Sequence, residues 1–181
     1  MTLSPTTLPL PKIDALPDVP RWAALAAHAV PLLVLPSGLW RIALTLGLPV
    51  ATVDDPTLGQ NVFQIVLTVV AELLAFLTLG LVRSWGEVYP RRLPFLGGRP
   101  VSRRGATAAA LGGAAGLFAL TGWFTYVAVA GLGADAEGVH TVGAFQQGLF
   151  LVCYLPLMAW APLLAAVAVA YSQRRRQRPL P

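Results

Sequence analysis

The sequence predicts an all-α fold class: an integral membrane four-helix bundle with both termini cytoplasmic. Three observations lead to this prediction. Of the 181 residues, 56% are hydrophobic and only 12% are charged, with a mean hydropathy of +0.66, whereas a soluble domain carries about 25% charged residues. Four long apolar segments are present, and basic residues gather on alternate sides of them. This composition argues against both a water-soluble globule and a disordered chain.

Residues 1–20 are expected to form a flexible, Pro-rich cytoplasmic leader. The segment contains five prolines with charged residues between them, and prolines at this density prevent a helix. It lacks the basic stretch, short apolar core and cleavage site of a secretory signal peptide.

The transmembrane domain is expected over residues 21–172. Its spans are placed at about residues 22–48, 62–82, 106–131 and 145–171. Each span is long enough to cross a hydrocarbon core ~30 Å thick at ~1.5 Å per residue. Helices are required, because the strands of a membrane barrel would alternate apolar and polar residues and these segments do not.

The distribution of charge predicts the orientation. Every Lys and Arg except Arg41 lies before or at the start of the first span, in the basic loop 83–105, or in the basic tail 173–181. The loops at roughly 49–61 and 132–144 hold acidic residues and no basic ones. Because basic loops stay in the cytoplasm, four spans with cytoplasmic termini, basic loop and tail are predicted, in the bacterial cytoplasmic (inner) membrane.

Anionic lipids of the bilayer are the predicted partners of the basic loop. The net charge of +5 and the pI of about 10.1 come from residues beside apolar spans, which favours lipid headgroups over nucleic acid. Specific binding of an anionic ligand or of a cytoplasmic partner by this loop stays open. The predicted lipid contacts are Arg83, Arg91, Arg92, Arg99, Arg103 and Arg104.

Glu72 is the single charged residue of the second span. An unpaired carboxylate at this depth is costly, and antiparallel spans would bring Arg41 of the first span within about one helical turn (~5 Å) in depth. We therefore expect Arg41 and Glu72 to form an intramembrane polar pair, with Gln64 as a polar neighbour closer to the outer face. The pair could fix helix packing, or it could be a proton-responsive or substrate-binding site; Arg41 reaching the outer headgroups is a further alternative.

His28, in the inner third of the first span, could relay protons or hold a haem. The second histidine, His140, lies in an outer loop, so haem ligation by both is not expected and a hydrogen-bonded packing role is predicted for His28. The sequence contains no HExxH, GxSxG or nucleotide-binding motif and no metal-ligand cluster, and its single cysteine, Cys153, lies in an apolar stretch. It therefore predicts no catalytic residue, no metal site and no cofactor.

The third span contains small residues at four-residue spacing, Ala108, Gly112 and Gly116. Small residues on one face let two helix backbones approach closely, which gives contacts that lipid cannot match. These residues are predicted to pack against another helix, either of the same chain or of a second copy.

The loop between spans two and three reads Trp85-Gly-Glu-Val-Tyr-Pro-Arg-Arg-Leu-Pro-Phe-Leu-Gly-Gly-Arg-Pro-Val. With this loop the chain resembles small four-span integral membrane proteins of actinobacterial type, which carry a WGxxxPRxxPxxxGRxV-like loop at this place. Gly98 and Arg99 match the GR element, and Val101 follows after Pro100. The resemblance covers the loop and the layout of the spans, so it implies the four-span topology and no catalytic residue.

Two classes of function follow from these observations. The first is a non-enzymatic inner-membrane protein that self-associates as a homo-oligomer or serves as an accessory subunit of another membrane protein. The alternative is a small transporter or proton-coupled permease that uses the Arg41 and Glu72 site, which the proline-interrupted first and fourth spans would suit. A membrane enzyme ranks third because the sequence shows no nucleophile or metal set.

Overall fold

The computed structural model describes residues 15–53, 57–88, 98, 100–130 and 139–177. Most of this part of the chain is helical, and its strands are one pair of two residues each. It has four helical segments long and apolar enough to cross a membrane, which confirms the all-α class and places such a helix at each predicted span. The elements are α1 (Arg21–Thr45), β1 (Thr52–Val53), α2 (Leu58–Thr78), the short 3-10 helices η1 (Leu79–Leu81) and η2 (Ser84–Gly86), α3 (Arg103–Val129), β2 (Val139–His140), α4 (Gly143–Tyr154), the 3-10 helix η3 (Leu155–Ala159) and α5 (Trp160–Gln177).

The helix ends differ from the predicted spans by a few residues, for local reasons. α1 ends at Thr45, before the predicted boundary, and Gly47 follows with a left-handed φ of 74°, a common way to end a helix. α2 begins earlier than predicted, at Leu58. There the Thr57 hydroxyl accepts a hydrogen bond from the Gln60 N–H, and the Gln60 side chain accepts one from the Thr57 N–H, which forms a capping box.

The fourth span is a broken helix. α4, η3 and α5 follow one another without a loop over Gly143–Gln177, and the 3-10 segment η3 carries Pro156 near its start. Proline has no N–H to donate and its ring clashes with the preceding turn, which explains the break. Pro162 lies in the first turn of α5, where a missing N–H costs no hydrogen bond.

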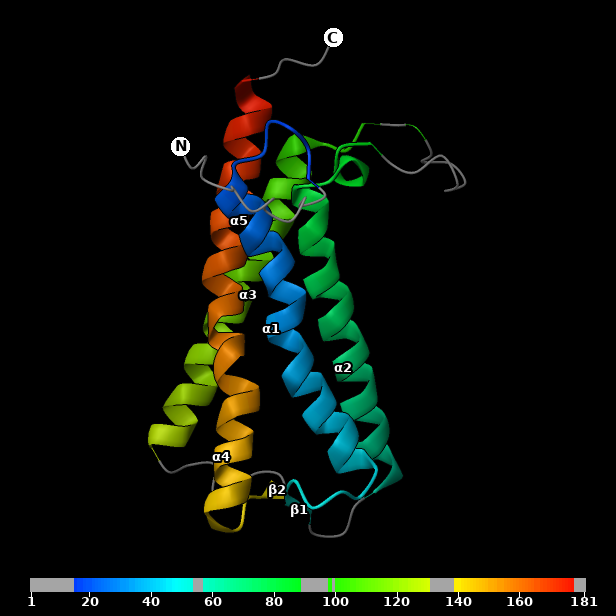
Figure 1. The fold of residues 1–181 in the computed structure, drawn as a ribbon, viewed down its shortest axis with the longest axis vertical. Coiled ribbons are helices and arrows are strands. Elements are labelled where there is room, and N and C mark those ends of the chain that lie inside the picture. Colours follow the sequence, from blue (N-terminus) through cyan, green and yellow to red (C-terminus); the bar gives the residue numbers. More distant parts are fainter. Residues whose placement is uncertain (1–14, 54–56, 89–97, 99, 131–138, 178–181) are drawn as a thin grey trace, which may run out of the picture.

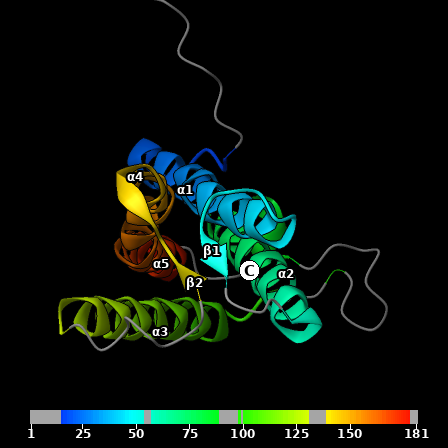
Figure 2. The ribbon, with the colours of Figure 1, turned by 90° about the horizontal axis from the view of Figure 1, so that it is seen from below.

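The helices form an open arc (Figures 1 and 2). α1 packs against α2 on one side and against α4, η3 and α5 on the other, while α3 packs against α5. Between the described parts of α2 and α3 there is no comparable packing. The order across the arc is therefore α2, α1, α5, α3, and α3 forms one edge of it.

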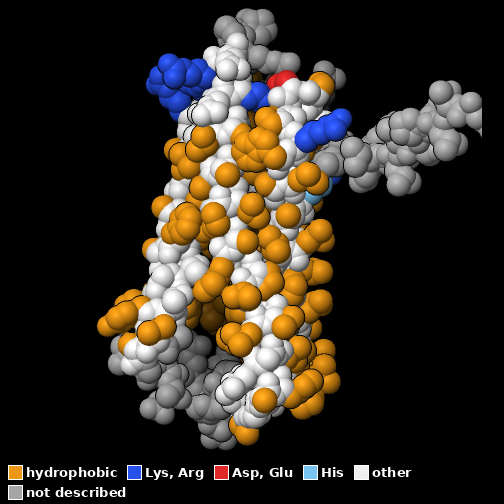
Figure 3. Space-filling view, turned by 60° about the vertical axis from the view of Figure 1, so that its left-hand side comes forward, with side chains coloured by type: hydrophobic (Ala, Val, Ile, Leu, Met, Phe, Trp, Pro, Cys, Tyr) orange, Lys and Arg blue, Asp and Glu red, His pale blue; other side chains and the backbone are white. Residues whose placement is uncertain are grey.

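The two ends of the helix assembly, taken along the helix axes, differ in character. We call the end with the start of α1 and the end of α5 the basic end, and the end with β1 and β2 the strand end (Figure 1). The buried core includes Val30, Val34, Ala75, Val167 and Tyr171, each no more than 2% exposed. Hydrophobic side chains cover the length of the face in Figure 3, with Lys and Arg gathered at one end; hydrocarbon would cover such an exterior in a membrane.

The strand end ties two connecting segments together. β1 and β2 pair antiparallel, with Thr52 opposite His140. The side chain of Gln146, in the first turn of α4, accepts a hydrogen bond from the Val142 N–H at 2.6 Å and donates one to the Pro49 carbonyl at 3.2 Å. The start of α4 is thereby linked to the segment that follows α1.

Candidate functional site

Arg41 is a buried charge on the strand-end half of α1. Its side chain belongs to a residue only 9% exposed, and its guanidinium carbon lies 5.3 Å from the ring centre of Tyr154. Tyr154 stacks on Phe150 at 4.3 Å, and Trp40 meets both rings edge-on. The aromatic rings hold the guanidinium through cation–π contact. Its Nη1 atom is buried without a hydrogen-bond acceptor among the described residues.

Glu72 lies on α2 at the level of Gly38 of α1. A Cβ atom on Gly38 would be 3.3 Å from Glu72 Oε1 and 3.1 Å from the Thr68 methyl group, so glycine permits the close approach of the two helices here. Arg41 is one turn further along α1 than Gly38. The two side chains make no direct ion pair in the described structure. Glu72 Oε1 is buried and has no donor within the described structure.

Polar residues continue along α2 from Glu72 towards the strand end. Asn61, Gln64, Thr68 and Glu72 are each half-buried or buried, whereas the other residues from 61 to 72 are exposed and apolar, except for half-buried Ala71. Their spacing places them on one helix face, the face that meets α1. Gln64, predicted as a neighbour of the polar pair, therefore shares this face with Glu72. We call these four residues the polar stripe.

His28 has two hydrogen-bond partners. Its Nε2 lies 3.3 Å from Arg83 Nη2 and its Nδ1 lies 2.8 Å from the Ala24 carbonyl. Because a guanidinium only donates, Nε2 accepts, and the proton is assigned to Nδ1, which donates to the carbonyl. Both ring nitrogens of His28 therefore have a partner, which is the arrangement that the predicted packing role requires. His140 lies in β2 at the strand end, whereas His28 lies in the half of α1 nearer the basic end.

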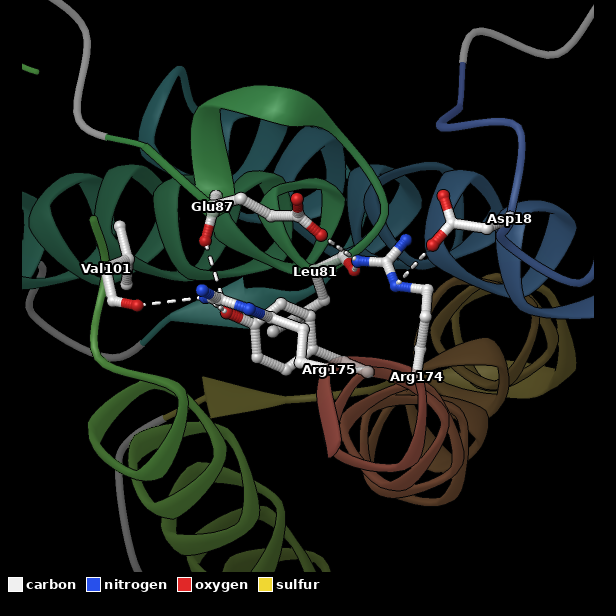
Figure 4. Close-up of polar contacts among 8 residues, drawn as sticks. Asp18, Leu81, Glu87, Val101, Arg174 and Arg175 are labelled. Carbon is white, nitrogen blue, oxygen red and sulfur yellow. Dashed lines mark hydrogen bonds and ion pairs between the residues drawn. The ribbon is translucent and has the colours of Figure 1, made fainter. Parts of the chain in front are cut away.

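At the basic end, Arg174 joins three parts of the chain (Figure 4). Its Nη2 donates to Glu87 Oε1 at 2.7 Å and lies 3.4 Å from the Leu81 carbonyl oxygen, and its Nε lies 3.7 Å from Asp18 Oδ2. The side chain is only 9% exposed. Arg174 thus connects the end of the predicted leader, the start of the basic loop and α5. Residues 1–14 of that leader lie outside the described residues.

The next residue, Arg175, holds the other end of the basic loop. Its Nη1 donates to the Val101 carbonyl at 2.9 Å and to the Tyr171 hydroxyl oxygen at 2.8 Å. The Tyr171 hydroxyl donates in turn to the Gly86 carbonyl at 3.3 Å. We call the contacts of Arg174, Arg175 and Tyr171 the clasp, because they fasten both ends of the loop to α5.

Sequence reasoning assigned Arg174 and Arg175 only to a basic tail and missed the clasp. The available signal was the isolated acid of the basic loop, Glu87, which no like charge accompanies. Among the predicted lipid contacts, Arg83 lies at His28, and Arg103 and Arg104 begin α3. The remaining three, at positions 91, 92 and 99, lie outside the described residues.

The small residues predicted to pack lie on the open side of α3. Ala114 is 2% exposed, and a Cβ on Gly113 would meet a Leu164 methyl group of α5 at 3.8 Å. Ala108, Gly112 and Gly116, in contrast, are exposed. A Cβ on either of these glycines would meet no described atom within 4 Å.

A groove of about 560 Å³ separates the strand-end half of α3 from η3 and the start of α5. Figure 3 shows a hollow between the helical columns. The lining of the groove is mostly apolar. The lining residues are Phe118, Thr121, Gly122, Thr125, Tyr126, Val129, Met158 and Ala161. Neither Arg41 nor Glu72 lines it.

Comparisons of the chain with protein-family models, with curated proteins and with solved structures find no match. The chemistry of the site therefore has to be argued from the residues alone. In the described ranges, no three His, Cys, Asp or Glu residues lie close enough together to hold a metal ion. The arrangement provides two charged positions inside a membrane-compatible helix pair, of which Arg41 alone is framed by aromatic rings, and an open helix face.

Proposed function

We propose that this chain is a multi-pass protein of the bacterial cytoplasmic membrane that works as a non-enzymatic, self-associating subunit. The observation that carries the proposal is the open face of α3. The charge distribution supports an orientation with both termini in the cytoplasm, and anionic headgroups suit the arginines of the basic end.

The two faces of α3 differ in what they contact. Residues advance by about 100° per position in a helix, so Ala108, Gly112 and Ala115 lie opposite the face that carries Gly113 and Ala114. The face with Ala114 packs on α5. The opposite one, which has Gly116 at its edge and continues through Ala119, consists of exposed small residues. We call this second face the small-residue face.

Glycine inside a helix costs about 1 kcal/mol relative to alanine. A compensating contact is therefore expected where glycines lie in the middle of a long helix, and α5 supplies none for Gly112 or Gly116. Lipid chains packed beside these glycines would make no better contact than they would make with a larger apolar side chain. A second helix does gain, because its backbone can approach closely.

A second copy of the chain suits this face best. In a two-fold dimer with α3 packed in parallel on α3 of the copy, each residue of the face meets its own equivalent. Packing of α3 against a helix of a different membrane protein is the accessory-subunit form of the same proposal. It would use the same face without self-contact at equivalent residues.

Disulfide cross-linking in native membranes tests the proposal. In a Cys153→Ser background, Ala115→Cys is expected to form a covalent dimer on mild oxidation. Leu120→Cys is the matched control, because Leu120 is 53% exposed on α3 but lies about 120° from the small-residue face. Equal cross-linking of the two variants would contradict the proposal, and absence of cross-linking at Ala115 would favour a different partner over self-association.

Bulky substitution gives a second test. Gly112→Leu and Gly116→Leu are expected to abolish assembly in mild detergent or lipid nanodiscs while leaving the monomer folded, because no described atom stands within 4 Å of either position. The measurement is the mass of the protein–detergent particle by light scattering. Unchanged mass in both variants would show that this face is not the interface.

A further inference from the structure

We propose that water enters the protein from the strand end, along the seam between α1 and α2, and binds between Arg41 and Glu72. The seam consists of the polar stripe of α2 and the residues of α1 that face it. This inference concerns a hydrated site inside the chain, so it goes beyond the proposed assembly and does not depend on it.

Three buried polar atoms at the inner end of the seam have no partner among the described residues. Arg41 Nη1, Glu72 Oε1 and Trp40 Nε1 are all buried, and none makes a hydrogen bond in the described structure. A buried water needs two to four polar partners, which the charged groups of Arg41 and Glu72 offer and the apolar surroundings of Trp160 do not. A guanidinium donates to water and water donates to a carboxylate, so bridging water satisfies both charges without direct contact.

A row of polar side chains leads from the strand end to this position. Asn61, Gln64 and Thr68 lead from the strand end to Glu72 on the one face of α2 that is not exposed. On α1, Thr45 lies two turns beyond Gly38, on the face that approaches Thr68. Ionisable side chains inside membrane helices face the bundle interior or a water-filled cavity, and the polar stripe connects Glu72 with the strand end. The outward face of the same stretch of α2 carries apolar residues alone, so water has one polar side to follow.

Towards the basic end the seam is closed by apolar side chains. From Glu72 towards the basic end, the seam continues into four side chains with no exposed surface: Val34, Val30 and Ala27 of α1 and Ala75 of α2. These four side chains are apolar and belong to the packed core, so they offer no hydrogen-bond partner to water. The hydrated seam therefore opens at the strand end only.

The charge of the site favours water over an ion. One guanidinium and one carboxylate give no net charge at the inner end of the seam. A lone anion would be repelled by Glu72, and a lone cation would be repelled by Arg41. The break in the fourth span lies next to the same place, since η3 begins directly after Tyr154. Irregular backbone at membrane depth occurs where it is buried in protein or lines a cavity.

Cysteine labelling in sealed membrane vesicles tests the proposal. In a Cys153→Ser background, Gln64→Cys and Thr68→Cys place a thiol in the seam, and Val69→Cys places one at nearly the same depth on the exposed apolar face. Thr78→Cys probes the closed part, because Thr78 is 2% exposed near the other end of α2. A membrane-impermeant methanethiosulfonate reagent is added to right-side-out and to inverted vesicles, because only a hydrated thiol ionises and reacts.

From the strand-end side, the seam cysteines are expected to react about tenfold faster than Val69→Cys, since thiolate forms only in contact with water. Thr78→Cys is expected to stay unreactive from either side. Equal rates at positions 68 and 69 would overturn the hydrated seam and indicate a dry, directly paired Arg41 and Glu72. Rapid reaction of Thr78→Cys from either side would overturn its closure.

A measurement on the unmodified chain covers the case in which a variant does not fold. Trp40 and Trp160 are both buried and their indole N–H groups have no acceptor in the described residues. Trp160 belongs to the apolar core. Magnetisation transfer from water to the indole N–H in nanodiscs is expected for Trp40 and not for Trp160, and the absence of transfer to Trp40 would contradict the proposal.

Discussion

Replacement of Arg174 by alanine removes the central member of the clasp. The guanidinium makes a charged hydrogen bond to Glu87 at 2.7 Å, a longer contact with the Leu81 carbonyl oxygen and an ion pair with Asp18. The Arg174 side chain is 9% exposed and that of Glu87 is 26% exposed, so water shields this pair only in part. The variant leaves two acids of the basic end without this partner.

The expected loss in the free energy of unfolding is about 2 to 3 kcal/mol. A hydrogen bond to a charged group contributes about 1.5–3 kcal/mol, whereas an exposed ion pair contributes about 0–1 kcal/mol. The limited exposure of Arg174 places its bond to Glu87 in the first group. The contacts with Asp18 and Leu81 are longer and add little to the sum.

Denaturant titration in detergent micelles, followed by circular dichroism, measures this loss. Arg176→Ala is the matched control, because Arg176 occupies the same last turns of α5 but is exposed. A double-mutant cycle of Arg174→Ala with Glu87→Gln isolates the pair, and we expect a coupling of more than ~1 kcal/mol for contacting residues. Equal stability of Arg174→Ala and Arg176→Ala would refute the stabilising role of the clasp.

Three further substitutions test the packing. Gly86→Ala places a Cβ on the backbone of Gly80, so it is expected to cost about 3 kcal/mol as overpacking, read as the midpoint of detergent-phase unfolding; an unchanged midpoint would contradict the close approach. Gly38→Ala brings a Cβ to 3.3 Å from Glu72 Oε1 and is expected to cost about 1–2 kcal/mol by the same titration, and a stabilised variant would show that the helices are further apart. Trp160→Ala empties a core position that is 4% exposed, with an expected loss of about 3–5 kcal/mol; a loss below ~1 kcal/mol would mean that the ring is not in the core.

The four helices follow from the sequence because each needs only a long apolar segment, a property local to that segment. Helix ends were less predictable, since the start of α2 depends on the Thr57 capping box and its side-chain geometry. The broken fourth span was expected to bend, and Pro156 locates the break. These features all depend on residues close together in the chain.

The candidate site required more than local pattern. The depth of Arg41 and Glu72 follows from counting residues along antiparallel helices, but the lack of direct contact depends on the Tyr154 ring that holds the guanidinium. The clasp joins Glu87 to Arg174 across 87 positions, and charge alone gives no register for such a pair. From the sequence, the small residues of α3 could pack against a helix of the same chain or of a second copy. In the structure, a Cβ on Gly112 would meet no described atom within 4 Å.

The dependence of α3 on α5 has a consequence for biogenesis. α1 and α2 are neighbours in the chain and pack on each other, so they can insert as a hairpin. α3 packs extensively only on α5 among the described elements, and residues 130–159 must be synthesised before α5 begins. At about 5–20 residues per second this takes a few seconds. During that interval the nascent α3 would lack its packing partner. A ribosome that stalled between α3 and α5 would leave the incomplete protein accessible to membrane chaperones.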